Sequence, residues 1–436
     1  MSTRVLYIAH NHPSIRPGGA EQHALELHRA MSATPGMESV LLTKGGPPVG
    51  PTGRVHEGTC LAPVNGHANE YFMFTDGYTF DYLNGTMTGK DFYSKHFREF
   101  LHAIKPDVVH FQHTLFLGYD LSREVANTLP NAAILYTLHE YLPICARDGQ
   151  LVRSANNELC EEETPTRCHG CFPHITPQAF FLRKRFIQSQ FGLVDMFLAP
   201  SRFLLERYVE WGIPRHKIRF QDYGRMPVRR GAEPSRQTRN RLAFFGQLSG
   251  YKGVDVLLEA MRLIQLESAP AAAGPTLKVH GANLELQDGE FKRIVARLLE
   301  ETRDSVTLVG KYRPEQLPAL MRDIDWVVVP SIWWENSPLV IQEAFLNQRP
   351  VICSNVGGMA EKVTPGVNGL HFRVGDPASL AEVIREAVQE PATWDRLRRG
   401  IPAIYRLDDQ VAELRAIYGA LLAGGLSSEE AYAAVR

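Results

Sequence analysis

Short apolar runs alternate with amphipathic stretches along most of this chain. The runs RVLYIA (4–9), ESVLLT (38–43), DVVHF (107–111), AAILYTL (132–138) and DMFLA (195–199) are continuous and brief. Such runs are typical of strands that are buried on both faces of a parallel sheet. Between the first two runs, Ala24, Leu27, Ala30 and Met31 recur at helical spacing. This alternation of strand and helix patterns predicts an α/β fold.

A polar, basic stretch without periodicity interrupts the pattern at 226–240 (MPVRRGAEPSRQTRN), as is typical of an interdomain linker. The alternation then resumes, with expected strands at 241–246, 277–281, 306–310, 326–330 and 351–353 and a helix in VDVLLEAMRLI. We therefore predict two α/β domains, at 1–225 and 226–405, and a terminal segment at 406–436 that contains the helix VAELRAIYGALLA.

Composition excludes some classes of function. A chain of 436 residues, 44% of them hydrophobic, can bury two cores of ordinary size. The formal net charge of −1, with no basic block, argues against nucleic-acid binding. The apolar run near the N-terminus is too short for a signal peptide, and no run of about 18 apolar residues could span a membrane. We expect a cytoplasmic protein, in which six cysteines do not form a disulfide framework.

A glycine pair follows the first predicted strand. Gly18 and Gly19, in HNHPSIRPGGAEQ, let the backbone approach a ligand closely at the start of a helix. The fingerprint G-x-G-x-x-G is absent, which argues against a nicotinamide enzyme. A plain tight turn is the alternative interpretation.

The stretch SIWWENSPLVIQEAF (331–345) follows the apolar run DWVVVP, so it leaves a strand at the carboxyl edge of a sheet, where open α/β sheets bind ligands. Glu335 is expected in the loop, and Glu343 in a helix that begins near Ser337 or Pro338. Unpaired amides at the helix start form an anion site; the predicted residues are Asn336, Ser337, Pro338 and Leu339. A carboxylate beside amides suits a ligand with hydroxyls and phosphate, although any acidic helix surface also produces two such glutamates.

Polar residues crowd the end of the predicted strand DVVHF. His110, Gln112 and His113 lie there, facing a cleft if the sheet is parallel. Because the register is uncertain by one residue, Gln112 or His113 could occupy the functional position, and we favour His113. A purely structural histidine is the alternative.

Four cysteines fall in an insertion at about 143–175, where the alternation is lost. Cys145, Cys160, Cys168 and Cys171 include one C-x-x-C pair. Four thiols in a short loop predict a structural zinc site, with an iron–sulfur cluster or free thiols as alternatives. Four thiolates leave no open position, so such a zinc would fasten the loop rather than catalyse.

The helix expected at 177–191 combines aromatic residues with the basic cluster Arg183, Lys184 and Arg185. Such a helix could rest on an anionic membrane surface. Ordinary packing against a sheet is the favoured interpretation, because the apolar residues span a normal width.

SIWWENSPLVIQEAF, followed by NQRPVICSNVGGMAEKVTPGVNGLHF, resembles the donor-binding signature of the retaining glycosyltransferases of family 4, and the similarity extends to most of the chain. The resemblance implies a GT-B fold, in which two Rossmann-like domains face each other across a cleft and the last helix returns to the first domain. It also implies a nucleoside-diphosphate sugar as donor, with no metal needed for catalysis.

The resemblance assigns roles residue by residue. Lys252 would bind the donor diphosphate, Glu335 hydroxyls of the sugar and Glu343 those of the ribose. Amides of the helix start would cap the phosphates, the loop of Gly18 and Gly19 would lie against the diphosphate, and His113 would lie near the transferred sugar.

One position departs from the family pattern. Gln247 stands where most relatives carry an arginine, five residues before Lys252. Glutamine cannot neutralise a phosphate, and a lost charge-assisted hydrogen bond weakens a site by about 1.5–3 kcal/mol. Arg225 is a candidate substitute. Asp323 and Asp325 match a metal-binding D-x-D, but they precede a strand and so lie at the wrong edge of the sheet.

We therefore predict a retaining, metal-independent transferase that moves a sugar to an acceptor (a glycan, a lipid or a small molecule) bound mainly by the first domain. The alternatives are a non-catalytic module that binds sugar nucleotides or glycans, and a sugar-nucleotide epimerase or phosphorylase of the same architecture.

Overall fold

The structure, a computed structural model, describes residues 2–15, 18–45, 61–64, 66–75, 79–228, 236–267 and 274–424. The chain divides into two compact units. Unit 1 comprises Met1–Gly224 and Leu407–Arg436, and unit 2 comprises Arg225–Arg406. Part of the predicted linker, 229–235, and the end of the chain, 425–436, lie outside the described residues.

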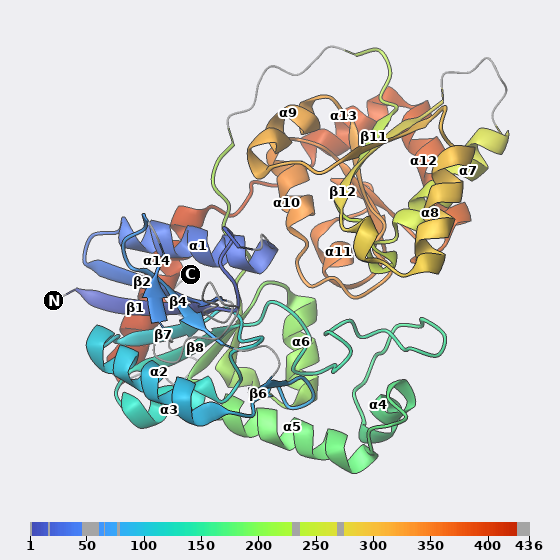
Figure 1. Ribbon diagram of the computed structural model, residues 1–436. Coiled ribbons are helices and arrows are strands. Elements are labelled where there is room, and N and C mark those ends of the chain that lie inside the picture. Colours follow the sequence, from blue (N-terminus) through green and yellow to red (C-terminus); the bar gives the residue numbers. More distant parts are fainter. Residues whose placement is uncertain are drawn as a thin grey trace, which may run out of the picture. The chain divides into compact units, whose positions relative to one another are not determined.

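Unit 1 is built on an eight-stranded sheet of order β10-β9-β8-β7-β1-β2-β4-β3 (Figure 1). Its strand pairs are parallel except β3 with β4. The strands are β1 (Thr3–Ala9), β2 (Met37–Gly45), β3 (Leu61–Pro63), β4 (Glu70–Phe74), β7 (Val108–Phe111), β8 (Ala133–Thr137), β9 (Met196–Ala199) and β10 (Ile218–Phe220), with a separate hairpin of β5 (Phe80–Asp81) and β6 (Thr86–Met87).

The helices of unit 1 are α1 (Gly19–Ser32), α2 (Lys90–Ile104), α3 (Leu121–Thr128), α4 (Pro165–Cys171), α5 (Pro177–Phe191), α6 (Arg202–Trp211) and α14 (Leu407–Leu422). Helix α14 lies beside α1 (Figure 1) and shares a core with β1, β7 and β8, to which it contributes Val411, Leu414 and Tyr418. The last helix is therefore part of the first sheet's core.

Unit 2 is a six-stranded parallel sheet of order β13-β12-β11-β14-β15-β16. Its strands are β11 (Arg241–Gln247), β12 (Thr276–Ala282), β13 (Val306–Gly310), β14 (Trp326–Val329), β15 (Val351–Ser354) and β16 (Gly369–Phe372). Its helices are α7 (Val254–Glu267), α8 (Gly289–Glu301), α9 (Leu317–Arg322), α10 (Leu339–Leu346), α11 (Gly357–Lys362), α12 (Pro377–Gln389) and α13 (Pro391–Arg399).

The alternation of side chains along β11 places a core on each face of this sheet. Leu242 and Phe244 join the core formed with α7, α8, α12 and α13, whereas Ala243 and Phe245 join the core formed with α9, α10 and α11. Successive residues of a strand point to opposite faces, so a continuous apolar run is buried on both sides. The predicted α/β fold with parallel sheets is confirmed.

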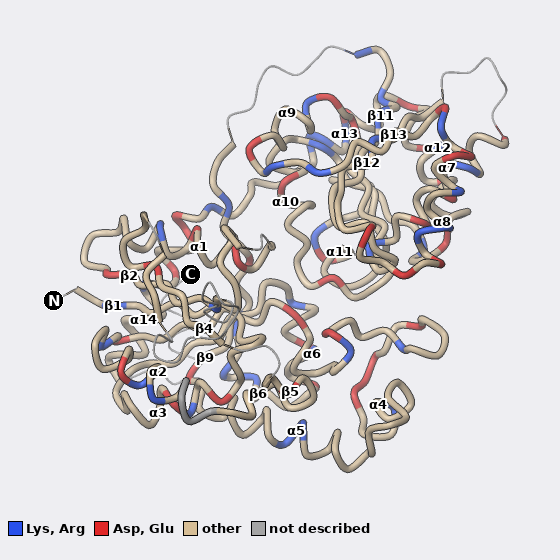
Figure 2. Tube along the Cα trace, viewed as in Figure 1, with Lys and Arg blue, Asp and Glu red and all other residues tan. Residues whose placement is uncertain are grey.

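Charged residues of both signs are interspersed along both units (Figure 2), in keeping with the near-zero net charge. Among the described helices, none is long and apolar enough to cross a membrane.

Candidate functional site

Three loops converge at the carboxyl edge of the sheet in unit 2. The loop after β11 carries Lys252, the loop after β14 carries Glu335, and the loop after β15 leads into Gly357 and Gly358 at the start of α11. Strands β11, β14 and β15 are neighbours in the sheet and parallel, so their carboxyl ends lie together.

Lys252 and Glu335 form the centre of this site. The Lys252 ammonium lies 2.5 Å from Glu335 Oε1, which also accepts hydrogen bonds from Ser331 Oγ at 2.8 Å and Trp333 Nε1 at 3.0 Å. The Glu335 side chain is 7% exposed and that of Lys252 is 30% exposed. Three donors on one oxygen fix the carboxylate, and the carboxylate in turn orients the lysine.

Glycines allow the loops to approach this closely. Gly253 has φ +65°, and a Cβ there would lie 2.0 Å from the Pro330 carbonyl oxygen. A Cβ on Gly358 would lie 1.6 Å from the Asn336 carbonyl oxygen, and the Gly358 N–H donates to the Glu335 carbonyl oxygen at 2.7 Å. The backbone around Glu335 is therefore positioned by residues without side chains.

The predicted row of amides needs correction. Helix α10 begins at Leu339, and Pro338, at its N-cap, has φ −65° and ψ 116°. Pro338 has no backbone N–H, so it cannot cap a phosphate as predicted. The Ser337 N–H donates to the Asn336 side-chain oxygen. The helix start thus offers fewer amide donors than the four-residue run suggested.

Glu343 lies in α10 and pairs with Arg225, whose Nη2 is 3.2 Å from Glu343 Oε1. The two side chains are 22% and 12% exposed. The suggestion that Arg225 replaces the arginine missing at position 247 finds no support here, because Arg225 pairs with Glu343, the predicted ribose-binding carboxylate. Gln247 is exposed at the carboxyl end of β11.

Asp323 and Asp325 lie at the opposite edge of the sheet, before β14. Asp325 is fully buried and accepts hydrogen bonds from Arg236, Arg239 and the backbone N–H of Arg241. This is a structural ion-pair network rather than a metal-binding D-x-D.

In unit 1, histidines gather at the carboxyl ends of β1, β7 and β8. The rings of His10 and His113 have centroids 4.1 Å apart. The buried side chain of Gln112 accepts from His139 Nε2 at 2.9 Å. Burial lowers the pKa of His113 well below its usual range. Sequence reasoning missed His10, although its place directly after the first predicted strand was a usable signal.

Gly18 is the residue before α1, and Gly19 is the first residue of that helix. Gly18 adopts an extended backbone with φ −157°. Its lack of a side chain leaves room for a neighbouring carboxylate, that of Glu21. Contact with a diphosphate stays a prediction.

The cysteine segment is fastened by ion pairs and hydrogen bonds. Cys145, Cys160, Cys168 and Cys171 are free, and among the described residues no group of three or more His, Cys, Asp or Glu side chains could hold a metal ion. The geometry therefore gives the predicted zinc site no support.

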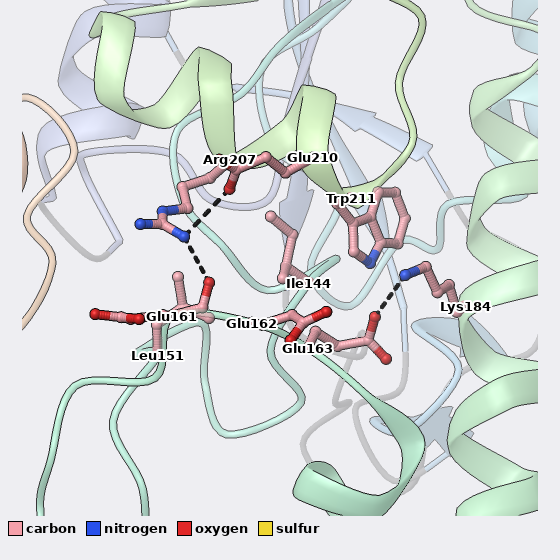
Figure 3. Close-up of a pocket in the computed structure, with 9 residues that line it drawn as sticks. All are labelled: Ile144, Leu151, Glu161, Glu162, Glu163, Lys184, Arg207, Glu210 and Trp211. Atoms are coloured by element: carbon pink, nitrogen blue, oxygen red, sulfur yellow. Dashed lines mark hydrogen bonds and ion pairs between the residues drawn. The ribbon is translucent and has the colours of Figure 1, made fainter.

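Instead, residues of α5 and α6 hold this segment. Lys184 lies 2.9 Å from Glu163, and Arg207 donates to the Glu161 carbonyl oxygen at 2.5 Å (Figure 3). The buried Arg183 donates to the Pro143 carbonyl oxygen at 2.7 Å. Two of the three cations suggested for membrane contact, Arg183 and Lys184, are thus bound to partners within unit 1. The third, Arg185, lies over the exposed Phe181 ring.

Two known protein families match successive parts of the chain. Residues 17–220 match the family described as Glycosyltransferase Family 4, and residues 227–402 match Glycosyl transferases group 1. A D-inositol 3-phosphate glycosyltransferase of Streptomyces avermitilis is 31% identical over 168 residues, which cover 36% of this chain and 34% of that protein. The chain thus spans about a third of the length of this curated relative.

Solved structures resemble the whole fold. Sucrose-phosphate synthase from Thermosynechococcus elongatus has a TM-score of 0.69 at 18% identity, over 97% of this chain and 100% of that chain. Anabaena HepE in complex with UDP has a TM-score of 0.63 at 16% identity, over 95% and 100% of the two chains.

Two Rossmann-like units of this kind define the GT-B class of glycosyltransferases. Within that class, the chain belongs to the family that joins a Glycosyltransferase Family 4 domain to a Glycosyl transferases group 1 domain.

Proposed function

We infer that the chain transfers a sugar from a nucleoside-diphosphate sugar to an acceptor, with retention of anomeric configuration and without a metal ion. The observation that carries this proposal is the ion pair of Lys252 and Glu335 at the carboxyl edge of unit 2. One cation and one carboxylate, side by side, match the phosphate and hydroxyl groups of such a donor.

The departing diphosphate gains negative charge in the transition state, and a preorganised cation stabilises it. An ammonium has three donors, of which Glu335 takes one, and the Lys252 side chain is partly exposed. Glu335 would accept from hydroxyls of the sugar. Glu343, held by Arg225, would accept from the ribose.

Gln247 favours a second candidate, a module that binds sugar nucleotides without transferring the sugar. An exposed glutamine supplies no charge to the leaving diphosphate. Such a module would bind donors, yet it would not turn them over.

Binding and turnover together test both candidates. UDP, which a similar solved structure contains, is the first probe, followed by UDP-glucose and GDP-mannose in titration calorimetry and in a diphosphate-release assay. We expect binding and slow release, unchanged by EDTA. Lys252→Met should reduce turnover by about 10²- to 10³-fold, as loss of one stabilising donor does.

Lys311→Met is the matched control, because that lysine is 72% exposed. Binding with no turnover would support the module, and absence of binding to every probe would count against both candidates. Release that EDTA abolishes would overturn metal independence. The configuration of the released or transferred sugar, read by NMR, tests retention.

A further inference from the structure

A pocket in unit 1 lies between the cysteine segment (143–175) and the helices α5 and α6 (Figure 3). The segment contributes Ile144, Leu151 and the three consecutive glutamates 161–163, and the two helices contribute the remaining lining residues. The pocket contains about 420 Å³ of empty space, counting the space at its open mouth. Sites for small molecules measure about 300–1,000 Å³, so the pocket is large enough for a small ligand.

Two buried groups at this pocket lack hydrogen bonds. Trp211 is 4% exposed, and its indole nitrogen has no hydrogen-bond partner among the described residues. The Glu163 side chain is 5% exposed, and Lys184 balances its charge, yet Glu163 Oε2 accepts no hydrogen bond of ordinary geometry within the described chain. Buried polar groups in folded proteins are nearly always hydrogen-bonded, so these two point to a bound molecule.

The two groups converge on the same space. The Lys184 ammonium lies 2.9 Å from Glu163 Oε2 and 5.9 Å from the centroid of the Trp211 ring. In Figure 3 the indole nitrogen is on the edge of the ring that is turned toward Glu163 and Lys184. An indole N–H only donates and a carboxylate only accepts, so a hydroxyl between them satisfies both groups at once.

The charge of the lining selects among ligands with hydroxyls. The glutamates 161–163 and Glu210 supply four carboxylates, whereas Lys184 and Arg207 supply two cations. The excess of negative charge repels an anionic ligand such as a phosphate or an acidic sugar. The apolar part of the lining is small, so it does not suit the hydrocarbon chain of a lipid.

We propose that this pocket binds one sugar residue of a neutral glycan. One hydroxyl of the sugar accepts from Trp211 Nε1 and donates to Glu163 Oε2, and a second accepts from Lys184. The C–H groups of the sugar ring contact Ile144 and Leu151. The site lies wholly within unit 1 and binds without making or breaking a covalent bond, so it goes beyond the proposed function and holds whether or not the chain transfers a sugar.

The test follows the tryptophan side chains of the full-length chain by NMR. The chain has five tryptophans, and Trp211→Phe identifies the Trp211 indole signal in a ¹H–¹⁵N spectrum. The probes are the methyl glycosides of glucose, mannose, galactose and N-acetylglucosamine, with methyl glucuronide as the anionic counterpart. We expect at least one neutral glycoside to move the Trp211 signal in a saturable way, and the glucuronide to leave it unchanged.

Glu163→Gln should weaken binding of that glycoside by about 10-fold or more, because a hydrogen bond to a charged group is lost. Glu206→Gln is the matched control, since Glu206 lies on α6, is 51% exposed and does not line the pocket. Trp211→Phe keeps an aromatic ring without the N–H, and saturation-transfer signals of the glycoside should show weaker binding to this variant too. Circular dichroism checks that each variant is folded.

Three results would overturn the proposal. A Trp211 signal that no neutral glycoside moves would mean that Trp211 and Glu163 share only a water molecule. Unchanged affinity in folded Glu163→Gln would place the sugar elsewhere, and equal binding of the glucuronide would contradict selection by charge. The titrations with UDP and UDP-glucose described above concern unit 2, so failure of either proposal leaves the other standing.

Discussion

Single residues without side chains shape the site in unit 2. The Gly357 backbone has φ +58°, and a Cβ there would lie 2.8 Å from the Glu335 carbonyl oxygen. The approach at Gly358 is closer still, because a Cβ on that residue would lie 1.6 Å from the Asn336 carbonyl oxygen. The position of Glu335 therefore depends on the absence of side chains at Gly357 and Gly358.

Gly358→Ala should displace the loop that carries Glu335. A displacement of about 1 Å in a catalytic group can cost about 100-fold in kcat/KM. Steady-state release of diphosphate from UDP-glucose measures the loss. Gly289→Ala, at an exposed helix position with nothing within 4 Å of its Cβ, serves as control. Activity near that of the unsubstituted chain in Gly358→Ala would mean that the loop adapts freely.

Arg225→Ala should weaken nucleotide binding through Glu343. If the arginine orients the ribose-binding carboxylate, UDP and UDP-glucose should lose affinity by a similar factor, about 10-fold or more. The double variant with Glu343→Gln should lose little beyond either single variant, because paired residues are not additive. Calorimetry gives all four affinities. Additive losses would mean that Arg225 acts on another group, such as the diphosphate.

At the scale of elements, α14 is joined to the first sheet by a buried chain of hydrogen bonds. The Tyr418 hydroxyl lies 3.1 Å from that of Tyr7 and 2.7 Å from His110 Nδ1, and His110 Nε2 lies 2.8 Å from Thr137 Oγ1. Tyr418 is 1% exposed. Helix α14 is therefore held to the sheet by hydrogen bonds as well as by apolar packing.

Tyr418→Phe should destabilise unit 1 by about 1–3 kcal/mol, because it leaves buried groups on Tyr7 and His110 without a partner. Urea denaturation followed by circular dichroism measures the change. Tyr82→Phe is the control, since Tyr82 is 56% exposed. Equal stability of the two variants would contradict a role for the hydroxyl network.

Sequence reasoning was strongest for the long apolar runs and weakest where the fold departs from them. Most of the parallel strands were predictable because burial on both faces removes polar residues from them. The edge strand β3, its neighbour β4 and helix α2 were not, since the region 45–100 shows little periodicity. Cysteine spacing suggested a metal, whereas the segment is held by Lys184, Arg183 and Arg207, whose partners cannot be recognised from spacing.

The same limit applied to the site. Sequence reasoning named Lys252 and Glu335 separately, but their ion pair joins positions 83 residues apart. It assigned four amides to the helix start, where the chemistry of Pro338 excludes one. His10 and Glu21 both lie in HNHPSIRPGGAEQ, but the pairing of their side chains could not be recognised from the sequence.

At the scale of the whole molecule, buried titratable groups make stability depend on pH. Burial lowers the pKa of His28 to about 4 and those of His110 and His139 to about 3, whereas it raises the pKa of Glu140 to about 8. The unfolded chain therefore binds more protons at these histidines below about pH 6.5, and the folded chain binds one more at Glu140 up to about pH 8.

The free energy of unfolding should therefore be highest near pH 6.5–7. It should fall toward pH 4, because the protons that the unfolded chain binds at three histidines outnumber the one that the folded chain binds at Glu140. It should fall more gently toward pH 8, where only the Glu140 proton is lost. Urea denaturation between pH 4 and 8.5 measures this curve. His110→Gln should reduce the acid slope by about one proton. A stability that stays constant between pH 4 and 6.5 would contradict neutral buried histidines.

The polypeptide leaves unit 1 after Gly224 and re-enters it at Leu407, so unit 2 is a domain inserted into the first. At the crossing, the Arg225 N–H donates to the Tyr405 carbonyl oxygen at 2.9 Å, so the two ends of the insert lie next to each other. Unit 2 can accordingly be cut out as one continuous gene fragment, 225–406. To express unit 1 alone, residue 224 must be joined directly to residue 407. A fragment that ends at 224 would lack helix α14, which forms part of the core of unit 1.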